Sequence, residues 1–120
     1  MKNYNGTATG TVFIDNKGSM KMDAFKSHPR VTFRMPRKGA KTVDTALIEA
    51  VLGLAGEVGE LTNLVKKLYR DNRPLDDEET QLELGDILHY TVVISNLLGY
   101  NLDAIMYKNI KKLEGRTKNE

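Results

Sequence analysis

The stretch Leu54–Lys67, LAGEVGELTNLVKK, predicts a helix that carries acids within an apolar surface. Apolar residues continue the pattern in both directions at alternating steps of four and three, the spacing of one helix face. They are Leu47, Val51, Leu54, Val58, Leu61, Val65 and Leu68. Because successive helix residues turn by about 100°, Glu57 projects inside this apolar arc and Glu60 lies at its edge. A carboxylate in a core is costly unless it is neutralised, paired or bound to a metal, so we expect a core-facing stripe with a cation beside the acids.

The composition limits the class of protein. The chain has 120 residues, of which 40% are hydrophobic and 28% are charged, and this balance is typical of one soluble globular domain. It contains no cysteine, which excludes a disulfide framework and a thiolate metal site. The first ten residues lack the apolar segment of a signal peptide, and no apolar run has the length of a membrane span. We therefore expect a cytoplasmic protein with no membrane partner.

Residues 1–41 form a basic arm ahead of an acidic body. The arm holds nine Lys or Arg against two acids, whereas residues 42–120 hold nine against fourteen. Such an arm suits nucleic acid, phosphates or the acidic body itself. No basic helix and no interleaving of aromatic with basic residues supports a nucleic-acid surface. We therefore favour a solvated tail or an arm that docks on its own body.

Short extended segments, and no helix, are predicted within the arm. Thr11–Ile14 and Ser19–Met22 flank the turn-rich residues 15–18 and would pair as a short hairpin, the alternative being an irregular arm. Val31–Arg34 is a third extended candidate, and Met35–Lys41 is predicted to be a loop.

One long helix is predicted next. It begins at Thr42 or Asp44, either of which can cap it, and its unbroken apolar stripe continues to about Arg70. Each glycine inside a helix costs about 1 kcal/mol relative to alanine. The helix nevertheless contains Gly53, Gly56 and Gly59. We therefore expect another backbone or a ligand to approach closely there.

Two further helices follow. The acids at positions 76–79 suit the first turn of a helix that continues to about Leu98 and ends at Gly99. The last helix extends over Leu102–Arg116 behind a possible cap at Asn101. All three long segments are helical, so the predicted fold class is all-α.

Polar groups recur on the apolar faces of both later helices. The middle helix is apolar almost all round, which predicts burial on most sides, yet Glu83 and Asp86 project into the same arc as Tyr90. On the last helix Asn109, Lys112 and Arg116 line one flank.

Four carboxylates are expected to meet in one cleft. Two acid pairs, each spaced by three residues, would face each other if their helices pack antiparallel. They are Glu57 with Glu60 and Glu83 with Asp86. Oxygen ligands without histidine or cysteine favour Mg²⁺, with Mn²⁺ as a substitute. Mg²⁺ commonly completes its shell with substrate phosphates, and the basic flank of the last helix would bind further phosphates.

These motifs resemble the MazG-type branch of the all-α nucleoside triphosphate pyrophosphohydrolases. The family pattern is an ExxE pair, a spacer, an ExxD pair, and an asparagine followed by a basic motif. In this chain it reads GLAGEVGE at 53–60, ELGD at 83–86, then Asn109, Lys112 and Arg116. The resemblance covers roughly residues 42–116. It implies a four-helix-type bundle of antiparallel helices, with the basic arm before it and a polar tail at 117–120.

The resemblance also implies an activity. Members hydrolyse a nucleoside triphosphate, or its deoxy form, between the α and β phosphates, which releases a monophosphate and pyrophosphate in nucleotide-pool house-cleaning. All four carboxylates would hold Mg²⁺, and Glu60 or Glu57 would act as the base on the attacking water. The implied substrate contacts are Lys67, Lys112 and Arg116 for the phosphates and Asn109 for the sugar or a phosphate.

Some alternatives stay open. Tyr90 would either stack on a base, as in the family, or belong to the core, and His89 is left out of the metal site. Phosphoribosyl-ATP pyrophosphohydrolase is an alternative activity that shares the fold. A helical module that binds metal or nucleotide without turnover is an alternative of another class. Short members of the family are dimers or tetramers, and the apolar middle helix fits burial between subunits.

Overall fold

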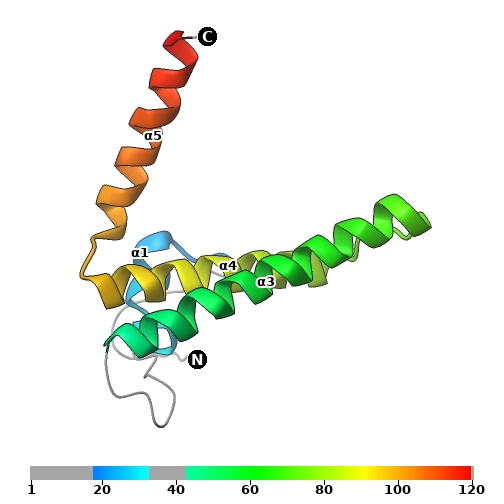
Figure 1. The fold of residues 1–120 in the computed structure, drawn as a ribbon, viewed down its shortest axis with the longest axis horizontal. Coiled ribbons are helices and arrows are strands. Elements are labelled where there is room, and N and C mark those ends of the chain that lie inside the picture. Colours follow the sequence, from blue (N-terminus) through cyan, green and yellow to red (C-terminus); the bar gives the residue numbers. More distant parts are fainter. Residues whose placement is uncertain (1–17, 33–42, 120) are drawn as a thin grey trace. The chain divides into compact units, whose positions relative to one another are not determined.

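A computed structural model describes residues 18–32 and 43–119 of the chain. The chain divides into two compact units, Met1–Arg34 and Met35–Glu120. Helices form the regular structure of the described residues, apart from a single β-bridge residue at Met20 (Figure 1). The prediction of an all-α fold is confirmed.

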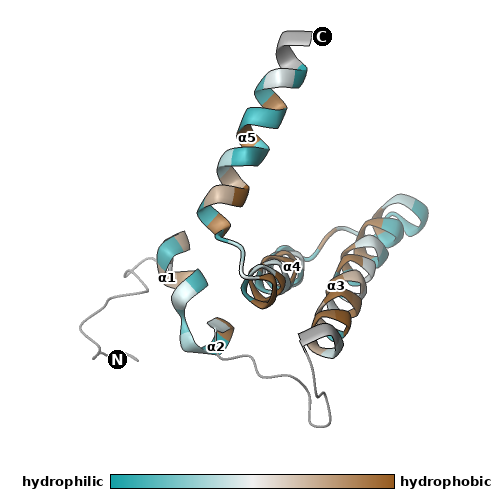
Figure 2. Cartoon of the chain, turned by 60° about the vertical axis from the view of Figure 1, so that its left-hand side comes forward, coloured by the Kyte–Doolittle hydropathy of each residue, from teal (hydrophilic) through white to brown (hydrophobic). Residues whose placement is uncertain are grey.

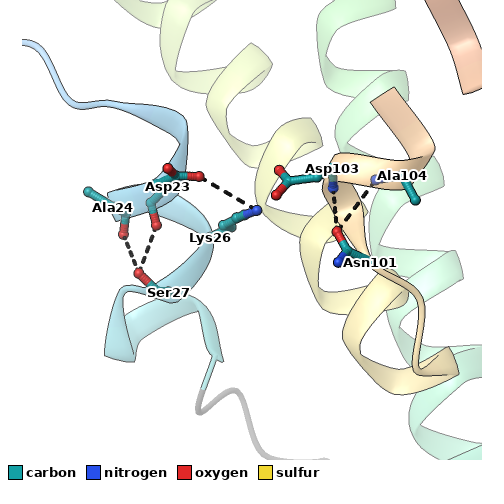
Figure 3. Close-up of polar contacts among 7 residues, drawn as sticks. All are labelled: Asp23, Ala24, Lys26, Ser27, Asn101, Asp103 and Ala104. Carbon is teal, nitrogen blue, oxygen red and sulfur yellow. Dashed lines mark hydrogen bonds and ion pairs between the residues drawn. The ribbon is translucent and has the colours of Figure 1, made fainter. Parts of the chain in front are cut away.

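The first unit contains two short helices where extended segments were predicted. Helix α1 is Met22–Ser27 and helix α2 is Pro29–Thr32. In α1, the Ser27 hydroxyl donates to the Asp23 carbonyl oxygen at 2.7 Å, and Lys26 Nζ lies 3.6 Å from Asp23 Oδ1 (Figure 3). The prediction that the arm lacks helix is therefore wrong.

Helix α2 also corrects the extended candidate that began at Val31. Pro29 opens this helix, where its fixed φ is favourable and its missing N–H costs nothing. Val31 and Thr32 donate their backbone N–H groups to the His28 carbonyl oxygen at 2.8 and 2.9 Å. Four residues are too few to display a helical period, so the β-branched side chains misled the prediction. Residues 11–14 of the predicted hairpin lie outside the described residues.

The second unit is built on a pair of long antiparallel helices (Figure 1). Helix α3 is Val43–Asp71 and helix α4 is Asp77–Leu98. The prediction of a single helix through the glycine-rich stretch is confirmed, since α3 has 29 residues. It ends where Asn72 adopts φ 56°, a left-handed conformation that asparagine tolerates. A five-residue connection then returns the chain along α3.

Both ends of α4 are capped, and the sequence predicts the one at Gly99. At its start, Asp76 Oδ1 accepts the backbone N–H of Glu79 at 2.8 Å. At its end, Gly99 adopts φ 74°, which places its own N–H 3.2 Å from the Asn96 carbonyl oxygen. A residue without Cβ takes this left-handed conformation at little cost.

Helix α5 is Leu102–Asn119 and follows a second predicted cap. Asn101 Oδ1 accepts the backbone N–H groups of Asp103 at 2.8 Å and Ala104 at 3.4 Å (Figure 3). The helix extends beyond the predicted end at Arg116 into the predicted polar tail. α5 makes at most slight contact with α3 and α4, which pack closely along each other.

The apolar stripe of α3 is only partly buried, so the prediction that it faces the core is wrong for four of its seven members. Small residues sit deepest in the second unit's helix pair: Ala46 and Ala50 are buried on α3, and Val93 on α4. Four stripe residues are exposed, namely Val51, Val58, Val65 and Leu68. Apolar residues accordingly colour much of α3 in Figure 2, whereas α5 alternates between apolar and polar.

Helix α4 shows a similar difference between its two halves. Val92 and Val93 are buried, but Leu82 and Leu84 are 60% and 51% exposed. Within one chain, the predicted burial of α4 on most sides is therefore found only toward its C-terminal end. Among the helices of the described residues, none combines the length and apolar character that crossing a membrane requires.

Candidate active site

Three carboxylates meet between α3 and α4. Glu57, Glu83 and Asp86 each present an oxygen, and these three oxygens lie within 4.8 Å of one another. Glu83 and Asp86 share one side of α4 because they are three residues apart. The antiparallel return of α4 along α3 (Figure 1) brings the carboxylates of that side to Glu57. The structure therefore unites three of the four predicted metal ligands.

The electrostatics of the cluster centre on Glu83. Its Oε1 atom is buried and has no hydrogen-bond partner in the described part of the chain. Burial raises the pKa of Glu83 above its ordinary value of 4.5, and a hydrogen bond with Glu57 raises it further. The negative charges of Glu57, Glu60 and Asp86 act in the same direction. The carboxylates of the cluster therefore repel one another unless a proton or a cation neutralises part of their charge.

The donor set fits a hard divalent cation. Carboxylate oxygens are the ligands that Mg²⁺ and Mn²⁺ prefer, and the cluster contains no sulfur or imidazole donor. A cation would also compensate the buried Glu83 oxygen, which is otherwise costly to desolvate.

Glu60, the fourth predicted ligand, lies beside this cluster and not within it. It is exposed on α3, three residues beyond Glu57. Its charge still contributes to the raised pKa of Glu83, so it lies within electrostatic reach of the site. Its predicted roles as ligand and base stay predictions, as does the alternative of Glu57 as the base.

The predicted phosphate-binding residues are placed apart from the cluster. Lys67 is half-buried on α3, ten residues after Glu57, which corresponds to about 15 Å along the helix. Asn109, Lys112 and Arg116 are exposed on α5. Because α5 makes only slight contact with α3 and α4, these three residues are not packed against the carboxylates within one chain. Their substrate contacts stay predictions.

Tyr90 packs against the backbone of α3. A Cβ placed on Gly53 would lie 2.5 Å from Tyr90 Cε1 and Cζ, and 2.8 Å from its hydroxyl oxygen. Gly53 therefore leaves the room that this ring occupies. The neighbour of Gly53 is the side chain of Tyr90, and not the backbone or ligand that was expected. At Gly56 and Gly59, no described atom beyond the adjoining backbone of α3 lies within 4 Å of such a Cβ. Stacking of Tyr90 on a base stays a prediction.

Sequence reasoning passed over another acid on the same side of α3. Glu49 lies two turns before Glu57, is half-buried, and has its Oε2 atom shielded from solvent. Its place eight residues before Glu57 was a usable signal, because residues separated by about two helical turns share a face.

A comparison with protein families identifies this arrangement. The pattern of the MazG nucleotide pyrophosphohydrolase domain matches residues 47–120. The chain belongs to this family. The MazG region contains nearly all of α3 with α4 and α5, and it includes all three carboxylates of the cluster. The resemblance inferred from the motifs is confirmed.

A phage protein is similar over most of the chain. The Gene 37 protein of Mycobacterium phage L5 is 32% identical over 101 residues, which cover 81% of this chain and 89% of that protein. The matched length exceeds the MazG region, so the similarity reaches into the N-terminal unit. No solved structure matches the chain.

Proposed function

We propose that this MazG-family chain is an Mg²⁺-dependent nucleotide pyrophosphohydrolase that converts a nucleoside or deoxynucleoside triphosphate to its monophosphate and pyrophosphate. The observation that carries the proposal is the meeting of Glu57, Glu83 and Asp86 between two facing helices. Membership in a family of nucleotide pyrophosphohydrolases supports the reaction class. Removal of a damaged or surplus nucleotide from the pool is the corresponding role.

The reaction adds water to the α phosphorus. A new P–O bond forms there, the bond from the α phosphorus to the bridging oxygen breaks, and pyrophosphate leaves with that oxygen. A divalent cation at the cluster would neutralise phosphate charge and activate water. Glu57 or Glu60 would accept the proton of the attacking water. The exposed cations of α5, Lys112 and Arg116, would bind the remaining phosphate charge.

Product analysis tests the reaction. The purified full chain is incubated with Mg²⁺ and a panel of NTPs and dNTPs, and the products are resolved by ion-exchange chromatography. We expect monophosphate plus pyrophosphate from the wild type and neither from Glu83→Gln. The matched control is Glu114→Gln, which removes one exposed carboxylate from α5. Diphosphate plus phosphate as the products would refute the bond assignment.

The panel includes phosphoribosyl-ATP, so turnover of that compound alone would favour the alternative activity of histidine synthesis. Binding of metal or nucleotide without any turnover would favour a module that does not catalyse.

Self-association belongs to the same proposal. Val51, Val58 and Val65 repeat every seven residues along α3 and are 46%, 43% and 47% exposed. Such a continuous apolar face on a helix is suited to burial against a second copy of the chain. We expect a homodimer or homotetramer in light scattering coupled to size exclusion. Replacing Val58 and Val65 by Lys should shift the mass toward that of one chain, and a monomeric wild type would refute this part.

A further inference from the structure

One aromatic ring of α4 packs against a glycine in the backbone of α3. A Cβ on Gly53 would lie 2.5 Å from two ring carbons of Tyr90, a separation that real Cβ atoms essentially never show. Tyr90 itself is half-buried. Any side chain at position 53 must therefore displace the ring or move the helices apart.

This contact lies one helical turn from the carboxylate cluster on both helices. Gly53 precedes Glu57 by four residues on α3, and Tyr90 follows Asp86 by four residues on α4. Residues four apart share a helix face. A movement of α4 away from α3 at this contact would therefore also change the separation of Glu57 from Asp86 and Glu83.

We propose that Tyr90, seated on Gly53, is a positioning residue that sets the spacing of α3 and α4 for the cation held by Glu57, Glu83 and Asp86. The inference rests on the proposed function only in that it takes the cluster to bind a divalent cation. Mg²⁺ requires near-ideal octahedral geometry, and functional constellations tolerate errors of only about 0.5 Å. A displaced ring would exceed that tolerance while leaving every ligand in the sequence.

The glycine at position 53 is explained by this contact. Glycine in a helix interior is about 1 kcal/mol less favourable than alanine, so its presence in α3 needs a compensating gain. Around Gly56, three residues later in the same helix, no described atom beyond the adjoining backbone of α3 lies within 4 Å of a built Cβ. Gly56→Ala is therefore a matched control for Gly53→Ala, because both changes raise the helix propensity equally and only the change at position 53 affects Tyr90.

Binding of Mn²⁺ alone to the full chain, measured by electron paramagnetic resonance of the free ion, tests the proposal without relying on activity. We expect Gly53→Ala to weaken Mn²⁺ binding by about tenfold or more, the loss typical of a disturbed supporting residue. Gly56→Ala should bind as the wild type does. The double variant Gly53→Ala with Tyr90→Leu, which removes the obstructing ring, should recover part of the affinity.

A second pair of variants separates the ring from its hydroxyl group and covers a Gly53→Ala chain that does not fold. Tyr90→Phe retains the ring and should retain Mn²⁺ affinity, whereas Tyr90→Ala should lose it. Thermal unfolding of each apo variant, followed by circular dichroism, reports whether folding is retained.

The outcomes distinguish the two proposals. Equal Mn²⁺ affinity in the wild type and Gly53→Ala, or an equal loss in Gly56→Ala, overturns the positioning role and leaves the proposed function standing. A folded Tyr90→Ala variant that binds Mn²⁺ as tightly as Tyr90→Phe also overturns the positioning role. A wild type that binds no Mn²⁺ and turns over no nucleotide overturns both.

Discussion

The carboxylates of Glu57 on α3 and Glu83 on α4 approach within 4.8 Å of each other. Two acids at this distance repel when both are ionised. Their closeness therefore destabilises the folded chain when no metal is bound.

Removing the Glu83 charge should stabilise the metal-free chain and abolish its response to cations. We expect Glu83→Gln to melt at a higher temperature than the wild type in chelator, because the buried oxygen no longer carries charge. Mg²⁺ at 100 times its Kd should stabilise the wild type by about 2.7 kcal/mol and the variant far less. Differential scanning fluorimetry with Glu114→Gln as control makes the comparison. An unchanged Mg²⁺ response in Glu83→Gln would contradict it.

The metal-free wild type should lose stability as the pH rises above 4.5. Since the pKa of folded Glu83 is raised above 4.5, the folded state binds more protons than the unfolded state between 4.5 and that raised value. The free energy of unfolding therefore falls across this interval. Melting temperatures measured in chelator from pH 4.5 upward should show the gap to Glu83→Gln widening with pH. A difference in melting temperature that stays constant with pH would argue against a raised pKa of Glu83.

Removing the cap of α4 should weaken the whole helix pair. Asp76 Oδ1 accepts the backbone N–H of Glu79, and replacing such a cap by alanine costs about 1 kcal/mol. Urea unfolding of Asp76→Ala should show this loss. Asp77→Ala is the neighbouring control, because Asp77 lies in the first turn but does not cap it. Equal losses in both variants would mean that charge, and not the cap, matters.

Two glycine substitutions should act in opposite directions. Gly99→Ala forces a Cβ into a left-handed conformation, φ 74°, and should cost about 1 kcal/mol. Gly56→Ala improves helix propensity in open space and should gain up to about 1 kcal/mol. Both values come from urea unfolding at one protein concentration, because self-association would add to stability. A destabilised Gly56→Ala would reveal a neighbour supplied by another chain or a ligand.

The basic flank of α5 should serve the substrate and not the fold. We expect Lys112→Ala and Arg116→Ala each to raise the KM for a nucleotide substrate by about tenfold, since a charge-assisted hydrogen bond contributes about 1.5 kcal/mol. Melting temperatures should change little, because both side chains are exposed. Lys111→Ala is the control, as Lys111 lies 3.6 Å from Glu114. An equal rise in KM for Lys111→Ala would point to general charge attraction.

Much of this protein could be read from local pattern. Helix α3 follows from a stripe spaced by four and three, α4 from its acidic first turn and Gly99, and α5 from its cap at Asn101, because these signals operate within a few residues. Glu57, Glu83 and Asp86 were recognisable as charges in apolar arcs. The two short helices of the N-terminal unit were missed, since four to six residues do not display a helical period.

The sequence by itself determined the three long helices and which acids lie within their apolar arcs. Only the tertiary structure decided which acids meet: it united Glu57 with Glu83 and Asp86 and left Glu60 exposed, because the antiparallel register of α3 and α4 is set by packing between helices. The tertiary structure also decided that the ring of Tyr90 packs against Gly53 and that no other helix of the described chain packs against Gly56. The spacing of the glycines does not predict this difference. Periodicity fixes the direction in which a side chain points, whereas its neighbour depends on how a second helix is seated.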